Sequence, residues 1–264
     1  MKATEIKSCY IGPEISPEQF VSEHFFLYIG KGSIHGYDGN RNYTLKPGEY
    51  CIVRRNRLAR YNKERENGEF EKIVIIFDNV FLTAFREKHP LTLLEFTSPE
   101  AFVLLPKDQL IDNFIHSLMP YYTGFGKIDP QFADVKREEL LLILLKQNPG
   151  LAAALFNDQD VPDKINLEAF MNRNFKFNVS IERFAFLTGR SISGFKRDFE
   201  KTFHSTPSKW LTQKRLEEAH FLLSKKKQKP VDIYLDLGFE DLSHFSFAFK
   251  KQFGINPTDV IGNS

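Results

Sequence analysis

A pair of related segments near the C-terminus decides the fold. Residues 193–207 read SGFKRDFEKTFHSTP, and residues 243–257 read SHFSFAFKKQFGINP. Six of these fifteen positions are identical at a constant offset of fifty residues, where unrelated segments would share about one. Weaker matches extend the repeat back to residues 180 and 230. A repeat longer than one helix, with its apolar positions retained, indicates one supersecondary unit used twice.

The composition is that of a globular protein with room for two domains. The chain has 264 residues, 42% of them hydrophobic and 27% charged, and its 27 phenylalanines supply large core side chains. The N-terminus lacks a cationic start followed by an apolar stretch, and the longest apolar run, residues 140–145, is too short to span a bilayer. We therefore expect a cytoplasmic protein without a membrane partner. Cys9 and Cys51 have no neighbours at ligand spacing, so we expect neither a disulfide framework nor a zinc site.

The net charge of +2 is unevenly divided along the chain. Residues 161–264 carry 17 lysines and arginines against 12 aspartates and glutamates, a net charge of +5, whereas the rest of the chain has a net charge of −3. The basic excess coincides with the repeat. It is compatible with a polyanionic partner, but solvated basic faces are also common in proteins that bind none.

The N-terminal half reads as antiparallel strands followed by helices. Turn signals separate apolar runs at residues 25–29, 33–37, 43–45, 50–53 and 73–77, a spacing that suits a small barrel or sandwich. Pro106 is placed as the first residue of a helix with an apolar stripe, and a second, more apolar helix runs from Asp129-Pro130 to Asn148-Pro149-Gly150. Its surplus apolar surface packs against the barrel or against a second copy of the chain, and both alternatives stay open.

No catalytic or metal-binding pattern is present in the N-terminal half. His24 and His35 are eleven residues apart without a further ligand at suitable spacing, and the chain lacks the nucleophile-elbow, phosphate-loop and dinucleotide-binding motifs. We expect no metal and no cofactor. The arginines at residues 54, 55, 57 and 60 form either the rim of an anion pocket or a solvated strand end. This half reads as a sensor or a scaffold.

Each copy of the repeat has the pattern of a helix-turn-helix. Ser180 and Pro230 mark helix starts, and we expect short helices that run to Gly189 and Gly238. Second helices are expected over residues 191–203 and 241–253. Each carries its apolar side chains on one face, which predicts a core-facing stripe. The stripes consist of Ile192, Phe195, Phe199 and Phe203 in the first copy and of Leu242, Phe245, Phe249 and Phe253 in the second.

The opposite face and the segment between the copies favour DNA binding. Ser193, Lys196 and Arg197 lie at i, i+3 and i+4, where short polar and long cationic side chains reach base edges and phosphates from a helix in the major groove. A helix predicted over residues 207–227 spans about 30 Å at 1.5 Å per residue. It separates the two units by nearly one turn of DNA, about 34 Å.

Residues 164–262 resemble the DNA-binding domain of the AraC/XylS family of bacterial transcription regulators. The resemblance is carried by Ser191-x-x-x-Phe195-x-Arg197-x-Phe199, Pro207, Arg215-Leu216-x-x-Ala219-x-x-Leu222-Leu223 and Asp236-Leu237-Gly238-Phe239-x-Asp241-x-Ser243-x-Phe245-x-x-x-Phe249-Lys250-x-x-Phe253-Gly254-x-x-Pro257. It implies seven helices in two helix-turn-helix units, binding to double-stranded promoter DNA, and activation through contact with RNA polymerase. Family members often carry a cupin-like barrel and a helical dimerisation element in front of this domain.

The resemblance therefore implies an α+β chain of two domains. Residues 1–160 are expected to form a cupin-like antiparallel β barrel with helices, which binds an effector and dimerises. Residues 161–264 are expected to form an all-α domain in which a linker helix joins the two helix-turn-helix units.

The DNA-contacting positions of the family can be placed on this sequence. They fall on Arg190, Ser191, Ser193, Lys196 and Arg197 in the first copy and on Leu242, Ser243, Ser246, Phe247 and Lys250 in the second. Phe247 stands where arginine is common, and it either contacts a thymine methyl group or packs. The loss of a guanine-reading arginine costs about 1–3 kcal/mol of discrimination. His204 stands where glycine is usual, which is tolerable because histidine is enriched at positive φ.

We thus expect a DNA-binding transcription regulator, an activator rather than a repressor, that reads promoters chiefly through Ser193, Lys196 and Arg197. Its expected partners are promoter DNA, RNA polymerase, a small-molecule or protein effector, and a second copy of the chain. The alternatives are a repressor, a barrel switched by a protein instead of a small ligand, and a metal-free barrel enzyme that carries the helical domain.

Overall fold

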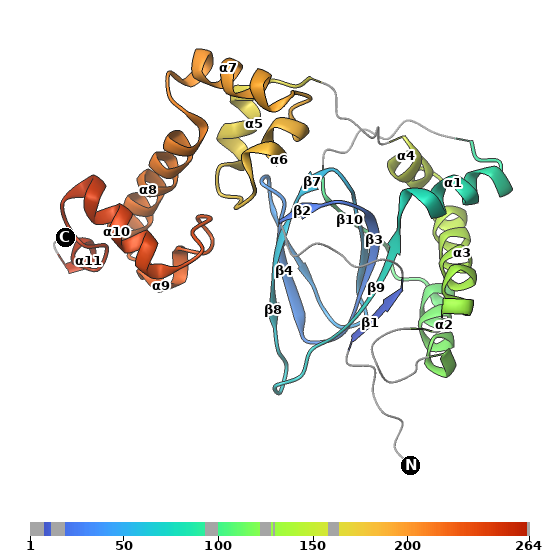
Figure 1. Ribbon diagram of the computed structural model, residues 1–264. Helices are drawn as coiled ribbons and strands as arrows, with labels where there is room; N and C mark the ends of the chain where they lie inside the picture. Colours follow the sequence, from blue (N-terminus) through green and yellow to red (C-terminus); the bar gives the residue numbers. More distant parts are fainter. Residues whose placement is uncertain are drawn as a thin grey trace. The chain divides into compact units, whose positions relative to one another are not determined.

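The computed structural model describes residues 8–11, 19–92, 100–121, 128, 130–157 and 164–262. The chain divides into two compact units, residues 1–160 and 161–264. The first unit consists of β-sheets and helices, and the second consists of helices among its described residues (Figure 1).

A five-stranded sheet is the centre of the N-terminal unit. Its strands run in the order β1 (Ser8–Ile11), β9 (Glu71–Phe77), β3 (His24–Lys31), β6 (Tyr50–Val53) and β10 (Phe102–Leu104). β1 is parallel to β9, and the other neighbours are antiparallel. A second sheet has the order β5 (Asn42–Leu45), β4 (Ser33–Tyr37) and β8 (Arg60–Glu64), and β2 (Phe20–Val21) pairs with β7 (Arg57–Leu58). All five predicted strands are present, and the pairings of the described residues form three separate sheets.

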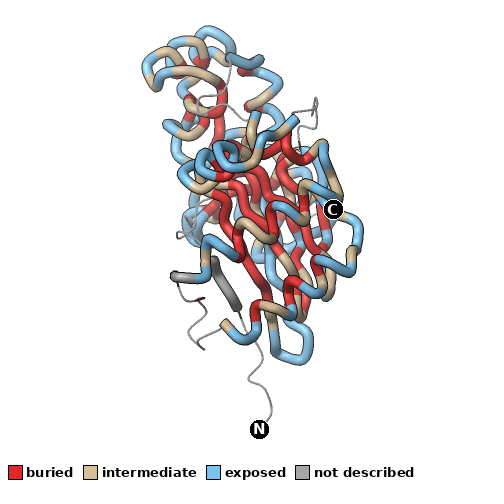
Figure 2. Tube along the Cα trace, turned by 90° about the vertical axis from the view of Figure 1, so that its right-hand side faces the viewer, coloured by how far each residue is buried: buried red, intermediate tan, exposed pale blue. Residues whose placement is uncertain are grey.

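Both faces of the five-stranded sheet are buried. Successive side chains of a strand point to opposite faces, so Ile73 and Ile75 of β9 face the helices, whereas Val74 and Ile76 face the second sheet. The first core contains side chains from the sheet and its covering helices, and the second lies between the two sheets. Buried stretches follow the strands, and exposed ones follow the turns and outer helix faces (Figure 2).

Helices cover one face of this sheet. They are α1 (Asn79–Lys88), α2 (Gln109–Ser117), η1 (Met119–Tyr121), α3 (Pro130–Gln147) and α4 (Leu151–Phe156). The placement of Pro106 as a first helical residue is wrong. Asp108 caps α2 by accepting a hydrogen bond from the Leu110 amide at 2.7 Å, and the Pro106 carbonyl instead accepts one from the Tyr50 hydroxyl at 2.8 Å. No helix in the described ranges is long and apolar enough to cross a membrane.

The C-terminal unit has seven helices within residues 164–262, as the resemblance implies. They are α5 (Leu167–Asn174), α6 (Ile181–Leu187), α7 (Ile192–Phe203), α8 (Pro207–Lys226), α9 (Pro230–Ile233), α10 (Leu242–Phe253) and α11 (Asp259–Gly262). α9 is shorter than expected, because it ends at Ile233 and the chain continues to Gly238 as turns.

Caps fix the ends of the repeated helices. The side chains of Ser180, Ser191 and Asp241 each accept a hydrogen bond from the amide three residues on. At the other end, His204 (φ 51°) and Gly254 (φ 76°) adopt the left-handed conformation that ends α7 and α10. The expected positive φ at His204 is thus confirmed.

Candidate nucleic-acid interface

Two ladders of aromatic side chains hold α7 and α10 against α8. Phe195 and Phe199 of α7 are fully buried, and Phe199 contacts Trp210 of α8 edge to face, with ring centroids 5.6 Å apart. In the second copy, Phe249 is fully buried and stacks on His220 of α8 at 6.2 Å. The two anchor residues on α8 lie ten positions apart, about 15 Å along the helix. Each copy of the repeat therefore packs against its own half of α8.

The face of α7 opposite this ladder is polar and cationic. Ser193, Lys196 and Arg197 are all exposed, and 80% of the Arg197 side chain is accessible. Arg197 lies midway between Phe195 and Phe199 in sequence, and at 100° per residue this places it directly opposite the buried stripe. Its guanidinium lies 3.6 Å from the carboxylate of its neighbour Asp198. A long cationic side chain thus stands at the centre of the exposed face.

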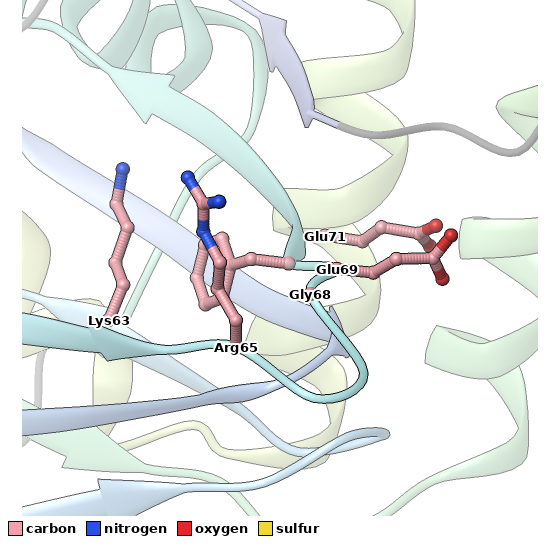
Figure 3. Close-up of a pocket in the computed structure, with 6 residues that line it drawn as sticks. Lys63, Arg65, Gly68, Glu69 and Glu71 are labelled. Atoms are coloured by element: carbon pink, nitrogen blue, oxygen red, sulfur yellow. The ribbon is translucent and has the colours of Figure 1, made fainter.

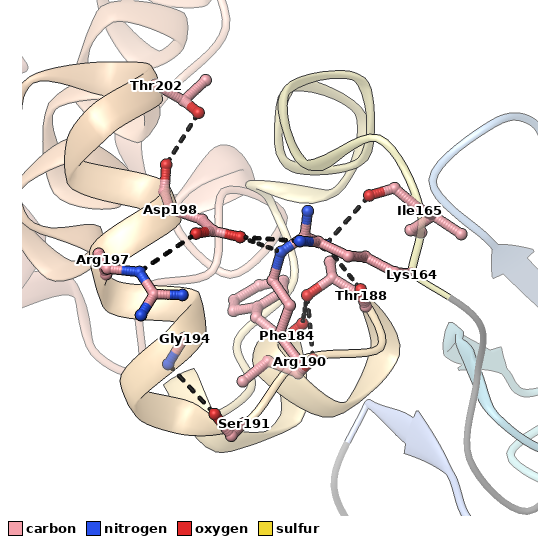
Figure 4. A network of polar contacts seen from close by, with 11 residues as sticks. Lys164, Ile165, Phe184, Thr188, Arg190, Ser191, Gly194, Arg197, Asp198 and Thr202 are labelled. Carbon is pink, nitrogen blue, oxygen red and sulfur yellow. Dashed lines mark hydrogen bonds and ion pairs between the residues drawn. The ribbon is translucent and has the colours of Figure 1, made fainter.

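Arg190 is placed differently from the other predicted contact residues. Its guanidinium is almost buried and donates to Asp198 at 3.1 Å and to the backbone carbonyls of Thr188 and Ile165 at 2.6 and 3.0 Å (Figure 4). The bond from Arg190 lowers the pKa of the Asp198 carboxyl. Arg190 therefore ties the turn before α7 to the middle of that helix and to the segment before α5. Ser191 stays exposed while its hydroxyl caps the helix at Gly194.

The corresponding face of α10 carries fewer polar groups. Ser243 and Lys250 are exposed, Ser246 is half-buried, and Leu242 is 37% exposed. Phe247 occupies the position equivalent to Arg197 and is 70% exposed, so the packing alternative for this residue is wrong. The structure thus places Ser193, Lys196 and Arg197 on one exposed face and Ser243, Phe247 and Lys250 on the equivalent face of α10. Only the first face has a cation at its centre.

Arg215 of α8 joins the segment that leads into the first helix-turn-helix unit to the turn of the second. Its guanidinium donates to the carbonyls of Phe175 and Phe177 at 2.8 Å each, in the segment between α5 and α6, and to that of Gly238 at 3.0 Å, in the turn before α10. Burial lowers its pKa to about 10, so the group stays charged at neutral pH. A side chain at Gly238 would lie only 2.7 Å from the Lys176 carbonyl oxygen, and the two turns therefore meet without space between them.

Two further contacts bridge the same junction. The Lys176 ammonium lies 2.6 Å from the Glu218 carboxylate of α8, and the Asn178 amide donates to the Glu240 carboxylate at 3.2 Å. In the sequence, Arg215 was identified only as part of the family motif, and its hydrogen bonds were not predicted. Its spacing could have indicated a buried position, because Arg215 lies four residues from both Leu211 and Ala219, on the apolar stripe of α8. A charged residue on a buried stripe indicates a buried partner.

Described residues of the N-terminal unit line two hollows. One of about 280 Å³ lies at the turn between β8 and β9, where Lys63 and Arg65 point to one side and Glu69 and Glu71 to another (Figure 3). Lys31 pairs with both of these carboxylates, at 2.9 and 3.2 Å. The other hollow, of about 300 Å³, lies between β3, β9 and α2. Its lining includes Tyr28, Ile73, Ile115 and Met119.

The C-terminal geometry is that of a protein with two helix-turn-helix units joined by one helix. Two family models match the chain: that of the ExsA N-terminal regulatory domain over residues 24–154 and that of a helix-turn-helix domain over residues 184–262. The chain belongs to the AraC/XylS family and is a DNA-binding transcription regulator rather than an enzyme.

Relatives match over nearly the whole chain. The virulence regulon transcriptional activator VirF of Yersinia enterocolitica is 25% identical over 243 residues, which cover 89% of this chain and 88% of VirF. The regulator ExsA of Pseudomonas aeruginosa is 23% identical over 265 residues, covering 96% and 91% of the two chains. Among solved structures, an apo form of ToxT from Vibrio cholerae is 14% identical, with a TM-score of 0.42 over 97% of this chain and 94% of that one.

We expect removal of the Arg215 donors to destabilise the C-terminal unit. Arg215→Met keeps the length of the side chain but removes three hydrogen bonds, which costs about 3 kcal/mol of unfolding free energy. Urea unfolding followed by the emission of Trp210, the only tryptophan of the chain, reports on this unit alone. Gln213→Ala, which removes one exposed side chain of α8, is the matched control and should change this free energy by less than about 0.5 kcal/mol. An unfolding free energy of Arg215→Met equal to that of the wild type would contradict the assignment.

Proposed function

We propose that this regulator activates transcription by placing α7 and α10 in successive major grooves of promoter DNA, with α7 as the principal reader of bases. The observation that carries the proposal is the position of Arg197. It is an exposed cation at the centre of a helix face whose opposite side is locked to α8 by Phe195 and Phe199. An arginine in this position reaches the O6 and N7 atoms of guanine with two hydrogen bonds.

The contact residues divide by chemistry. Ser193, Lys196 and Arg197 contact base edges, whereas Ser191 and Lys250 contact phosphates, which position the protein without reading sequence. Leu242, Ser243, Ser246 and Phe247 face the second half-site. The three bonds of Arg190 within the protein favour a supporting role, in which it orients α7 instead of touching DNA.

Activation rather than repression is favoured by the name of the relative VirF, a transcriptional activator. We propose that the DNA-bound chain contacts RNA polymerase in the cytoplasm. A reporter gene behind the bound promoter decides the sign, since deletion of an activator lowers expression and deletion of a repressor raises it.

The N-terminal unit is proposed to be a cupin-like barrel that controls the DNA-binding unit. Its two facing sheets enclose a continuous apolar core, and the two hollows beside them offer space for a small effector. A protein effector is the alternative. Calorimetry of the full chain against metabolites and against the products of neighbouring genes separates the two.

Arg197→Ala is expected to weaken binding to the natural promoter by about 1–3 kcal/mol and to relax the preference at one base pair, because a guanine contact is lost. Arg173→Ala removes the same charge from an exposed position on α5 and should leave the base preference unchanged. Both affinities are measured at several salt concentrations, since phosphate contacts make binding salt-dependent. A base preference of Arg197→Ala that equals that of the wild type would remove Arg197 from the interface.

The same proposal includes a homodimer formed through α3. Phe132, Val135 and Leu142 are 42%, 62% and 42% exposed and, at helical spacing, lie on one face. We expect light scattering to give the mass of a dimer for the wild type and of a monomer for Leu142→Glu, because a buried charge disrupts an apolar interface. Val80→Glu, at an 82% exposed position on α1, is the control and should remain dimeric. A monomeric wild type would refute this part of the proposal.

A further inference from the structure

Among the described residues of the C-terminal unit, Phe247 is the most exposed large apolar side chain. It is 70% exposed, against 57% for Val231 and Leu235 of the same unit. It lies midway between the buried Phe245 and Phe249, so its ring points directly away from the core. A ring in this position leaves most of its apolar surface in water. A single exposed apolar side chain is ordinary on a protein surface, so the neighbouring side chains decide what it contacts.

The surroundings of Phe247 identify the partner as DNA. Ser243 and Lys250 are exposed on the same face of α10, and Lys251 extends it. Lysines that flank an apolar centre suit the phosphates on either side of a groove. By the fifty-residue repeat, Phe247 has the position on α10 that Arg197 has on α7. The Arg215 contacts connect the turn before α10 to the segment that leads into the first helix-turn-helix unit. The face of α10 therefore continues the interface of α7.

The chemistry of the ring limits which bases it can face. A phenyl ring offers no donor or acceptor, so placing it against the polar edge of a guanine, cytosine or adenine would leave base atoms desolvated without partners. The C5 methyl group of thymine is the one apolar group that the bases present in the major groove. A ring that covers this methyl group removes apolar surface of both partners from water.

We infer that α10 recognises thymine through contact of the Phe247 ring with its C5 methyl group, an inference that rests on the proposed DNA-binding function. The two helices then read by different chemistry. α7 selects a base pair by hydrogen bonds from Arg197, and α10 selects a T·A pair by apolar contact.

Replacement of thymine by uracil tests the inference, because it removes the methyl group and keeps base pairing. The promoter site is first located by protection, and each thymine of the half-site under α10 is then replaced singly. We expect the wild type to lose affinity roughly three- to tenfold at one or two positions, up to the 1.4 kcal/mol that a tenfold change represents. Phe247→Ala should lose the same affinity on natural DNA and should lose no further affinity when thymine is replaced by uracil. In a double-mutant cycle, this result shows that the ring and the methyl group interact.

Controls separate this inference from the proposed function. Val231→Ala removes a 57% exposed apolar side chain from α9 and should respond to uracil as the wild type does. Because Phe247 is exposed, its variant should unfold at the same urea concentration as the wild type. If Arg197→Ala changes the base preference but Phe247→Ala binds both DNAs as tightly as the wild type, the thymine contact is refuted and the proposed function stands. If neither variant nor any base replacement changes binding, the proposed function fails as well.

Discussion

The hydrogen bonds of Arg215 are the constraint on which the DNA-binding unit depends. One guanidinium on α8 holds two carbonyls of the segment between α5 and α6 and one carbonyl of the turn before α10. The planar group with its fixed donors suits three carbonyls that approach from different segments, a geometry that a lysine ammonium does not reproduce. Because Gly238 leaves no room for a side chain at this junction, the two turns pack directly on each other. We therefore expect the folded chain, and not the DNA, to set the distance between α7 and α10.

The two copies of the helix-turn-helix unit therefore have the same buried side chains on their second helices but different side chains on the exposed faces. Buried phenylalanines hold both α7 and α10 to α8, through Trp210 in one copy and His220 in the other. The exposed centres carry Arg197 and Phe247. A rigid spacing makes this difference useful, since each helix then meets a defined position of the promoter with its own chemistry. In the proposed complex, Phe247 adds selectivity for a methyl group without adding to the salt dependence that lysines and arginines bring.

Local patterns in the sequence predicted the fold where local interactions decide it. Turn glycines and apolar spacing located the five strands, and the phenylalanine stripe located α7 and α10. Pro106 misled because proline is common at a first helical position, whereas Asp108 makes the better cap.

The exposed residues of the candidate site could be predicted from the sequence, but the contacts of the arginines that hold its helices in place could not. Exposed residues such as Arg197 and Lys196 follow from their position opposite the buried stripe. The inward orientation of the Arg190 side chain could not be predicted in this way, because it depends on Asp198 and on carbonyls up to 25 residues away. The bonds of Arg215 reach from 23 to 40 residues along the chain, beyond any local pattern.

Measuring the distance between α7 and α10 tests most directly whether the Arg215 junction fixes the spacing of the two recognition helices. Spin labels introduced as unnatural amino acids at Thr202 and Gln252, near the ends of α7 and α10, report it by pulsed electron resonance. If the Arg215 junction is rigid, the free protein gives one narrow distance distribution, and the same distance is found on promoter DNA. A broad distribution in the free protein that narrows only when DNA is added would contradict it.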